Sequence, residues 1–240
     1  MEFKTDAIVL KSADYKDNDK LLTLFTANHG ILRATIRGVK KPQSKLNFAA
    51  QPFAFCEYVL VEKGGFYTVK SAYMYDGFYP LRTDVVSFYA ANAAMSVCLS
   101  VLPENVANET MFIALAQTLR ELAYSDMDRV EPLVTFLLTA ASENGYAVDL
   151  DGCGVCGGEI GENPRFDFSL GCFICSNCGG GERASESTYH VLRKCAGLDF
   201  DENKTAGGKK RALRLMRVYL GEKTEESFPC IGETLQIYEE

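Results

Sequence analysis

Residues 30–45 have the sequence GILRATIRGVKKPQSK, and this stretch decides how the amino-terminal third of the chain folds. Its first half alternates between apolar and polar positions and contains β-branched residues, which is typical of a β-strand with one buried face. Its second half is a basic loop that contains a proline. Side chains alternate between the two faces of a strand, so Arg33 and Arg37 are expected to project from one face.

Four more short strands are predicted around this one. Turn-forming residues separate them at positions 17–19, 28–30 and 64–65. The strands themselves are apolar or alternating stretches at residues 7–10, 21–25, 53–61 and 66–75. Five strands in so short a segment favour a small β-barrel, and the OB-fold is a common barrel of this size.

The chain changes character after Pro80. Between residues 83 and 145, apolar residues recur at helical spacing and predict three helices. Asp84 is a suitable residue to start a helix, Pro132 is tolerated in a first turn, and Gly145 is a suitable residue to end one.

Residues 185–195 and 209–220 are predicted to be helical as well, whereas the tail from 228 to 240 is ambiguous. The expected fold is therefore an α+β chain of several domains. It comprises an OB-fold β-barrel at residues 1–80, an α-helical domain formed by residues 81–149 and 182–240, and an inserted zinc module at residues 150–181.

The inserted module contains nine glycines and five cysteines with little periodicity, so something other than a core is expected to order it. Two Cys-x-x-Cys pairs can supply an all-thiolate tetrahedral shell that suits structural Zn²⁺ and leaves no open position for water. Cys172 also stands three residues before Cys175, but a glycine follows both Cys156 and Cys178 and favours matching pairs. The predicted ligands are Cys153, Cys156, Cys175 and Cys178. Metal-free cysteines in a loop are the alternative.

The net charge of −7, taken as a whole, argues against a nucleic-acid partner. Resolved along the chain, however, residues 1–80 carry +3 and residues 81–150 carry −6, and no acidic residue occurs between positions 20 and 56. A basic strand and loop could follow a phosphate backbone while neighbouring aromatic rings stack on bases. The predicted DNA-binding residues are Arg33, Arg37, Lys40, Lys41 and Lys45. A solvated strand and loop is the alternative.

A series of short motifs resembles the bacterial RecO family of recombination mediators, which act in DNA repair. The motifs lie in order through the barrel, the helical region and the first cysteine pair. They are D6AIVLK11 with Tyr15, D19KLLTLF25, the stretch from His29-Gly30 through Arg37-Gly38 to Lys41-Pro42 and Ser44-Lys45, Q51PF53, and N144GY146 leading to Leu150.

This resemblance implies an OB-fold, a helical domain and a four-cysteine zinc module. It also implies binding of single- and double-stranded DNA, annealing of complementary strands, and action with RecR and RecF. Through these partners the family loads RecA onto strands coated by single-strand DNA-binding protein. Such a protein is expected in the cytoplasm with the nucleoid.

A second basic cluster lies in the predicted helix from residue 209. Basic residues recur on one side of this helix beside an apolar stripe, and the RecO family binds the acidic tail of single-strand DNA-binding protein. The predicted partner-binding residues are Lys210, Leu213, Arg214 and Arg217. The alternative is a surface helix whose apolar stripe packs in the core.

The sequence does not suggest an enzyme. His29 and His190 are the two histidines, and neither lies in a pattern that indicates a catalytic triad or a phosphate-binding loop. No apolar run approaches the ~20 residues that a membrane span needs. The competing interpretation is a zinc-stabilised protein–protein adaptor that does not touch nucleic acid.

Overall fold

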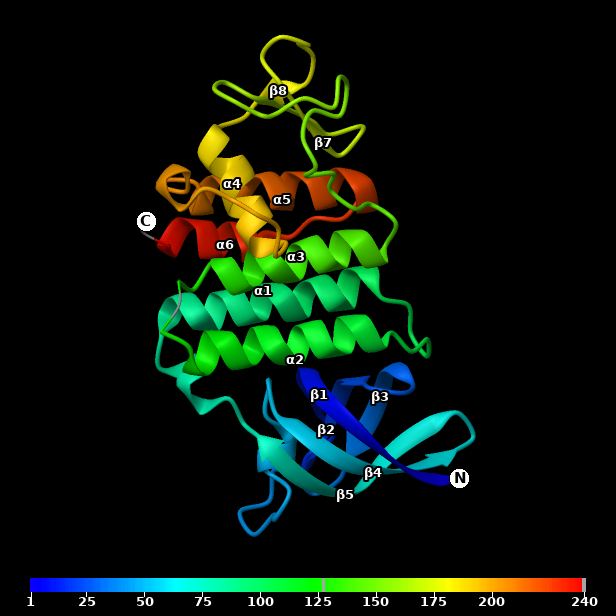
Figure 1. Ribbon diagram of the computed structural model, residues 1–240. Coiled ribbons are helices and arrows are strands. Elements are labelled where there is room, and N and C mark those ends of the chain that lie inside the picture. The colour runs from blue at the N-terminus through cyan, green and yellow to red at the C-terminus, as the bar shows by residue number, and fades with distance from the viewer. Residues whose placement is uncertain (127, 239–240) are drawn as a thin grey trace.

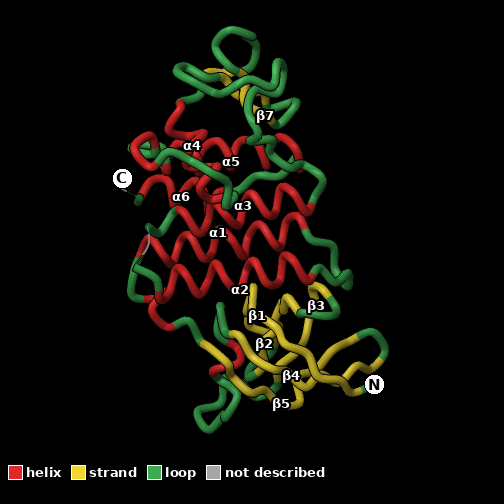
Figure 2. The backbone as a smooth tube through the Cα atoms, viewed as in Figure 1, coloured by secondary structure: helices red, strands yellow, loops and turns green. Residues whose placement is uncertain are grey.

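The computed structural model of the chain describes residues 1–126 and 128–238. Three parts follow one another along its length: a β-barrel at the amino-terminal end, a stack of helices in the middle, and a small module of loops and short strands at the far end (Figure 1). The trace coloured by secondary structure shows the same order, with strands at one end and loops at the other (Figure 2).

Five strands form the barrel, as the sequence predicts. They are β1 (Glu2–Tyr15), β2 (Asp19–Thr26), β3 (Gly30–Ile36), β4 (Phe55–Lys63) and β5 (Phe66–Asp76). The barrel is closed in the order β1-β2-β3-β5-β4, and β4 pairs back onto β1. β3 and β5 run parallel to each other, whereas the other neighbours are antiparallel. The architecture is that of an OB-like barrel.

The alternation of side chains along the strands gives the barrel two differently packed faces. Leu22, Leu24 and Leu32 fill its interior together with Tyr58, whose hydroxyl donates to the carbonyl of Ala49 at 2.7 Å. Ala49 belongs to the short 3₁₀ helix η1 (Phe48–Ala50), which lies between β3 and β4.

Part of the outer face is buried as well. Ile8, Phe25 and Ile31 point away from the barrel interior and belong to the larger core that the helices share. The ring of Phe25 contacts Phe112 of the helical part with centroids 5.5 Å apart. One end of the β1-β2-β3 face is therefore covered by helices.

The three helices predicted after residue 83 are confirmed as α1 (Val85–Val101), α2 (Glu109–Tyr124) and α3 (Glu131–Glu143). A short 3₁₀ helix, η2 (Tyr79–Arg82), precedes them. The Asp84 carboxylate accepts a hydrogen bond from the amide of Ser87 and caps α1. Pro132 lies in the first turn of α3, and Gly145, with φ of +81°, follows its end.

The later segments complete the helical stack. They form α4 (Glu186–Cys195), the 3₁₀ helix η3 (Glu202–Lys204), α5 (Lys209–Thr224) and α6 (Pro229–Ile237), so the ambiguous tail is a helix up to residue 237. α6 packs on α1, while α4 and α5 pack on α3. Among the described residues, none of the helices combines the length and the apolar character that crossing a membrane requires.

The cysteine-containing module has a core of its own, contrary to the expectation from its sequence. β6 (Arg165–Asp167) pairs with both β7 (Cys172–Ile174) and β8 (Glu182–Arg183). Phe166 and Phe173 are buried, with ring centroids 5.1 Å apart, and Phe173 contacts Tyr189 of α4 at 5.0 Å. The periodicity of the sequence does not reveal these strands because they are only two or three residues long.

The loop between α1 and α2 attaches the helices to the barrel. Asn105 donates its amide to the carbonyl of Ile31 at 3.1 Å, and Glu104 forms a parallel bridge with the same residue of β3. Gly30 has φ of +68° and lies so close to this loop that a Cβ placed on it would be 2.1 Å from the carbonyl oxygen of Val106. The position therefore requires glycine for space as well as for backbone conformation.

We expect Gly30→Ala to loosen the junction between barrel and helices. Gly64→Ala is the matched control, because Gly64 has φ of +60° but no atom within 4 Å of the place that a Cβ would take. Both variants bear the strain of left-handed backbone, roughly 1 kcal/mol. Overpacking should destabilise Gly30→Ala by about 1–3 kcal/mol more, measured by denaturant unfolding. Equal losses in the two variants would contradict the close approach.

Candidate nucleic-acid interface and metal centre

The structure brings the four cysteines of the two Cys-x-x-Cys pairs together. Their Sγ atoms all lie within 4.8 Å of one another, and those of Cys156 and Cys175 are 3.8 Å apart. The first pair lies on the loop after Leu150, and the second follows β7 directly. Cys153 and Cys175 are buried, whereas Cys156 and Cys178 are exposed. Four thiols this close could hold one metal ion.

Backbone amides stabilise negative charge on one of the four cysteines. The amide of Cys175 donates to Cys153 Sγ at 3.3 Å, and together with the amide of Cys156 it lowers the pKa of the Cys153 thiol to about 6. Cys178 behaves in the opposite way: hydrogen bonding to Cys156 and then to Cys175 raises its pKa to about 12. Adjacent thiolates repel one another, and a cation bound between them would offset this repulsion.

Cys172, the alternative ligand, lies outside this cluster of four. Its sulfur packs against the backbone of the first pair, since a Cβ built on Gly154 would be 2.4 Å from Cys172 Sγ. Burial raises the pKa of the Cys172 thiol. Gly154 also donates its amide to the carbonyl of Phe173, so Cys172 and its neighbour support the loop that carries the first pair.

The five predicted DNA-binding residues lie on the surface, in two groups. Arg33 lies beside the helical part and pairs with Glu104 at 2.6 Å. Arg37 and Lys41 lie at the other end of the face, where they line a surface cavity with Lys16 of the β1–β2 hairpin. The structure thus separates Arg33 from the rest, although both arginines point outward.

The remaining two residues belong to the loop after β3. Lys40 pairs with Asp14 at 2.8 Å, and the hydrogen bond from Lys40 lowers the pKa of the Asp14 carboxyl. Lys45 is exposed. Ion pairs at such exposed positions contribute little stability, so phosphate groups could replace the carboxylates at small cost.

Sequence reasoning missed three residues that this surface includes. Lys16 joins Arg37 through the hairpin, and Lys11 aligns with Arg33 because each pairs with Thr23 of β2. Phe66 is 80% exposed and directly precedes Tyr67, which pairs with Ala34 of β3. These residues come together through the pairing register of the strands, and the sequence of one segment does not show this register.

The prediction for helix α5 needs correction. Leu213 is fully buried in the helical core together with Met216 and Leu220, so it cannot offer a surface to a partner. The apolar stripe has the predicted spacing, but it packs within the chain. Lys210 donates to the carbonyl of Tyr238 at 2.9 Å, and the guanidinium of Arg217 lies over Gly232 of α6.

Arg214 lies on a different side, towards the cysteine-containing module. It lines a cavity of about 400 Å³ together with Arg183 of β8 and Arg211 of α5. The apolar part of this cavity comes from Phe168, Leu215 and Val218. A basic rim beside apolar walls therefore exists, but it is built from Arg214 and these neighbours, not from the stripe that contains Leu213.

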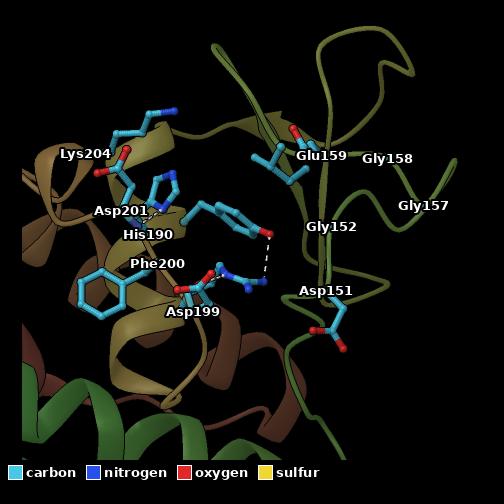
Figure 3. A pocket seen from close by; sticks show the side chains of 13 residues that line it. Asp151, Gly152, Gly157, Gly158, Glu159, His190, Asp199, Phe200, Asp201 and Lys204 are labelled. Atoms are coloured by element: carbon cyan, nitrogen blue, oxygen red, sulfur yellow. Dashed lines mark hydrogen bonds between the residues drawn. The ribbon is translucent and has the colours of Figure 1, made fainter.

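A further cavity of about 460 Å³ separates the first cysteine pair from α4 (Figure 3). His190 and Lys204 lie on one side of it, while Gly152 and Gly158 of the module lie on the other. Burial lowers the pKa of His190. No serine, threonine or cysteine is among the described residues that line this cavity.

Hydrogen bonds beside this cavity join α4 to the chain that enters the cysteine-containing module. Arg193 donates to the carbonyl of Leu150 and, at 2.5 Å, to that of Asp199, and Tyr189 also donates to Leu150 at 2.9 Å. Arg193 donates to the Tyr189 hydroxyl as well, at 3.3 Å, and a dashed line marks this bond in Figure 3. These bonds tie the chain that enters the module to α4 and so position the cysteine pairs relative to the helices.

Comparison with known proteins agrees with this architecture. The family model "Recombination protein O N terminal" matches residues 1–78, and "Recombination protein O C terminal" matches residues 82–229. The DNA repair protein RecO of Clostridium novyi is 31% identical over 80% of this chain and 75% of its own length. The RecO protein of Myxococcus xanthus is 32% identical over 82% of this chain and 80% of its own length. The RecO protein of a Thermoanaerobacter species is 27% identical over 94% of this chain and 94% of its own length. The chain therefore belongs to the RecO family of DNA repair and recombination proteins.

Proposed function

We propose that the chain is a non-enzymatic recombination mediator in the cytoplasm, associated with the nucleoid. In this proposal it binds single- and double-stranded DNA and anneals complementary strands. With RecR and RecF it helps RecA load onto DNA that is coated by single-strand DNA-binding protein. The barrel (residues 1–80) takes the DNA, the helical part (81–149 and 182–240) takes partners, and residues 150–181 take the metal.

The observation that carries the DNA-binding proposal is the basic outer surface of β1, β2 and β3 with its loops. Arg37, Lys41 and Lys16 converge there from two loops and outnumber Asp17 and Asp19, which line the same cavity, although the chain as a whole is acidic. OB-folds bind oligonucleotides on this type of surface. The exposed ring of Phe66 beside β3 offers a platform on which a base can stack.

We expect Arg37→Ala combined with Lys41→Ala to weaken binding of single-stranded oligonucleotides of every sequence. Each lost phosphate contact should reduce the slope of log affinity against log salt by roughly 0.7. Fluorescence anisotropy at several salt concentrations measures both quantities, and strand annealing should slow in parallel.

Lys4→Ala combined with Lys70→Ala is the matched control, since it removes the same charge from the β1–β4–β5 side, where these lysines pair with Glu57 and Glu2. Full DNA affinity in the Arg37/Lys41 variant, or equal losses in both variants, would show that DNA does not bind at this surface. Absence of DNA binding by the unmodified chain would favour the adaptor that does not touch nucleic acid.

The proposed metal is a structural Zn²⁺ held by Cys153, Cys156, Cys175 and Cys178. Four thiolates suit zinc, and they fill its tetrahedral shell, so the ion would order the two loops and perform no chemistry. The low pKa of Cys153 supports this proposal, because one thiolate is available near neutral pH to begin binding.

Acidification should release this metal. Binding requires thiolates, so protons compete more strongly as the pH falls, and even Cys153 becomes protonated below its pKa of about 6. We expect one zinc per chain near pH 8 and loss of zinc towards about pH 5, measured by elemental analysis after dialysis. Cys178→Ser should bind zinc less tightly, whereas Cys172→Ser should retain it. The reverse order for the two variants would show that Cys172 is the ligand.

We propose that the partner surface includes Arg214 and its cavity, with Lys210 and Arg217 as more distant basic groups. The cavity has three arginines against one carboxylate, Glu182, and apolar walls, which suits the acidic, hydrophobic-ended tail of single-strand DNA-binding protein.

Arg214→Glu should lower the affinity for a synthetic tail peptide roughly tenfold, the size of one charge-assisted hydrogen bond. Isothermal titration with the unmodified chain provides the reference. Arg120→Glu, at an exposed position of α2, is the control and should leave the affinity unchanged. Unchanged affinity in Arg214→Glu would remove this cavity from the partner surface.

A further inference from the structure

A cavity of about 370 Å³ lies where the outer face of the barrel meets the end of α1. Its volume is in the range of small-molecule sites, ~300–1,000 Å³. Lys11 and Arg33 line it from the barrel, Leu99 and Leu102 line it from the end of α1, and Glu104 lines it from the following loop. Arg33 is one of the predicted DNA-binding residues, but the proposal above assigns no ligand group to the cavity itself.

The strand register aligns the polar groups of the cavity. Lys11 of β1 is opposite Thr23 of β2, and Thr23 is opposite Arg33 of β3, so the three form one row across adjacent strands. Neighbouring strands are about 4.8 Å apart, which places the Lys11 and Arg33 backbones roughly 10 Å from each other. The long side chains of Lys11 and Arg33 can converge across this spacing on one phosphate group, with the Thr23 hydroxyl between them.

The walls of the cavity are aliphatic. Ile31 and Leu102 are almost fully buried, and Leu21 is half-buried. Leu99 is 40% exposed although it is a large apolar residue of α1, so part of its side chain faces the open cavity. Flat apolar ligands fit between such side chains, as extruded bases do in enzymes that bind them.

The ion pair between Glu104 and Arg33 can give way to a ligand. Its carboxylate lies 2.6 Å from the Arg33 guanidinium, but the side chains of Glu104 and Arg33 remain 48% and 64% exposed. A pair as exposed as this contributes little free energy, so a phosphate can replace the carboxylate at Arg33. The released carboxylate can then accept hydrogen bonds from the amino or imino group of a base.

We propose that this cavity binds one nucleotide of single-stranded DNA, with the base between Leu99 and the barrel and its phosphate between Lys11 and Arg33. The inference rests on the proposed DNA-binding function and specifies a base-binding site within it. The cavity lies on the same outer face as Arg37, four residues along the chain from Arg33, about 13 Å at the rise of a β-strand. A strand that follows the basic loop can therefore reach it.

A nucleotide fits these observations better than an apolar peptide does. Lys11 is exposed and the Arg33 side chain is 64% exposed, so both cations are available to a polyanion that also contacts Arg37 on the same outer face. The aliphatic walls then select a base that has been taken out of its stack. Duplex DNA keeps its bases stacked, so the site should distinguish single strands from duplexes.

The chain contains no tryptophan, so a single introduced tryptophan reports on its own surroundings. We expect the fluorescence of the Leu99→Trp variant to be quenched when oligodeoxythymidine binds, and to stay unchanged with an abasic strand of equal length. The control is Val85→Trp, at the other end of α1, where Val85 is 61% exposed and about 21 Å away by helical rise. Its fluorescence should change with neither strand.

Photocrosslinking of the unmodified full-length chain tests the same site without substitution. A strand that contains 4-thiothymidine should form adducts on residues 99–104 or on the facing β-strands. DNA binding by anisotropy without quenching of Leu99→Trp and without adducts at these residues would overturn the cavity proposal and leave DNA binding intact. Absence of any DNA binding by the unmodified chain would overturn the proposed function and this inference together.

Discussion

The helices cover one end of the outer face of β1, β2 and β3, and the rest of the structure depends on this contact. Ile8, Phe25 and Ile31 on that face join the core of the helical part, while Leu22, Leu24 and Leu32 fill the barrel interior. The strands are thus buried on both sides at one end and open at the other. This asymmetry leaves Arg37, Lys41 and Lys16 at the open end and places Arg33 beside the helices.

The cysteine-containing module is held in two ways that support each other. Its aromatic residues Phe166 and Phe173 pack on Tyr219 and Tyr189 of the helices, so part of the module is ordered by an ordinary core. One cysteine of each pair, Cys153 and Cys175, belongs to the buried core, whereas Cys156 and Cys178 are exposed. A metal ion bound by all four would tie the exposed ends of the loops to that core.

The charge distribution explains how an acidic chain can present a basic surface. The acidic middle segment lies mainly in the helices, and several of its carboxylates pair within the helical stack, as Glu131 does with Lys194 at 3.0 Å. On the barrel, Glu104 and Asp14 partly neutralise the neighbouring cations.

Strand alternation, helix-start residues and Cys-x-x-Cys spacing are local properties, so the five strands, the three middle helices and the two cysteine pairs can be predicted from the sequence. Which faces remain available depends on how these elements pack. Leu213 has the spacing of a surface stripe but lies in the core, because α5 packs on α3. Arg33 and Arg37 share a face but line different cavities, and Lys11 joins Arg33 through strand register. Such contacts join residues far apart in the chain, so periodicity along one segment carries no information about them.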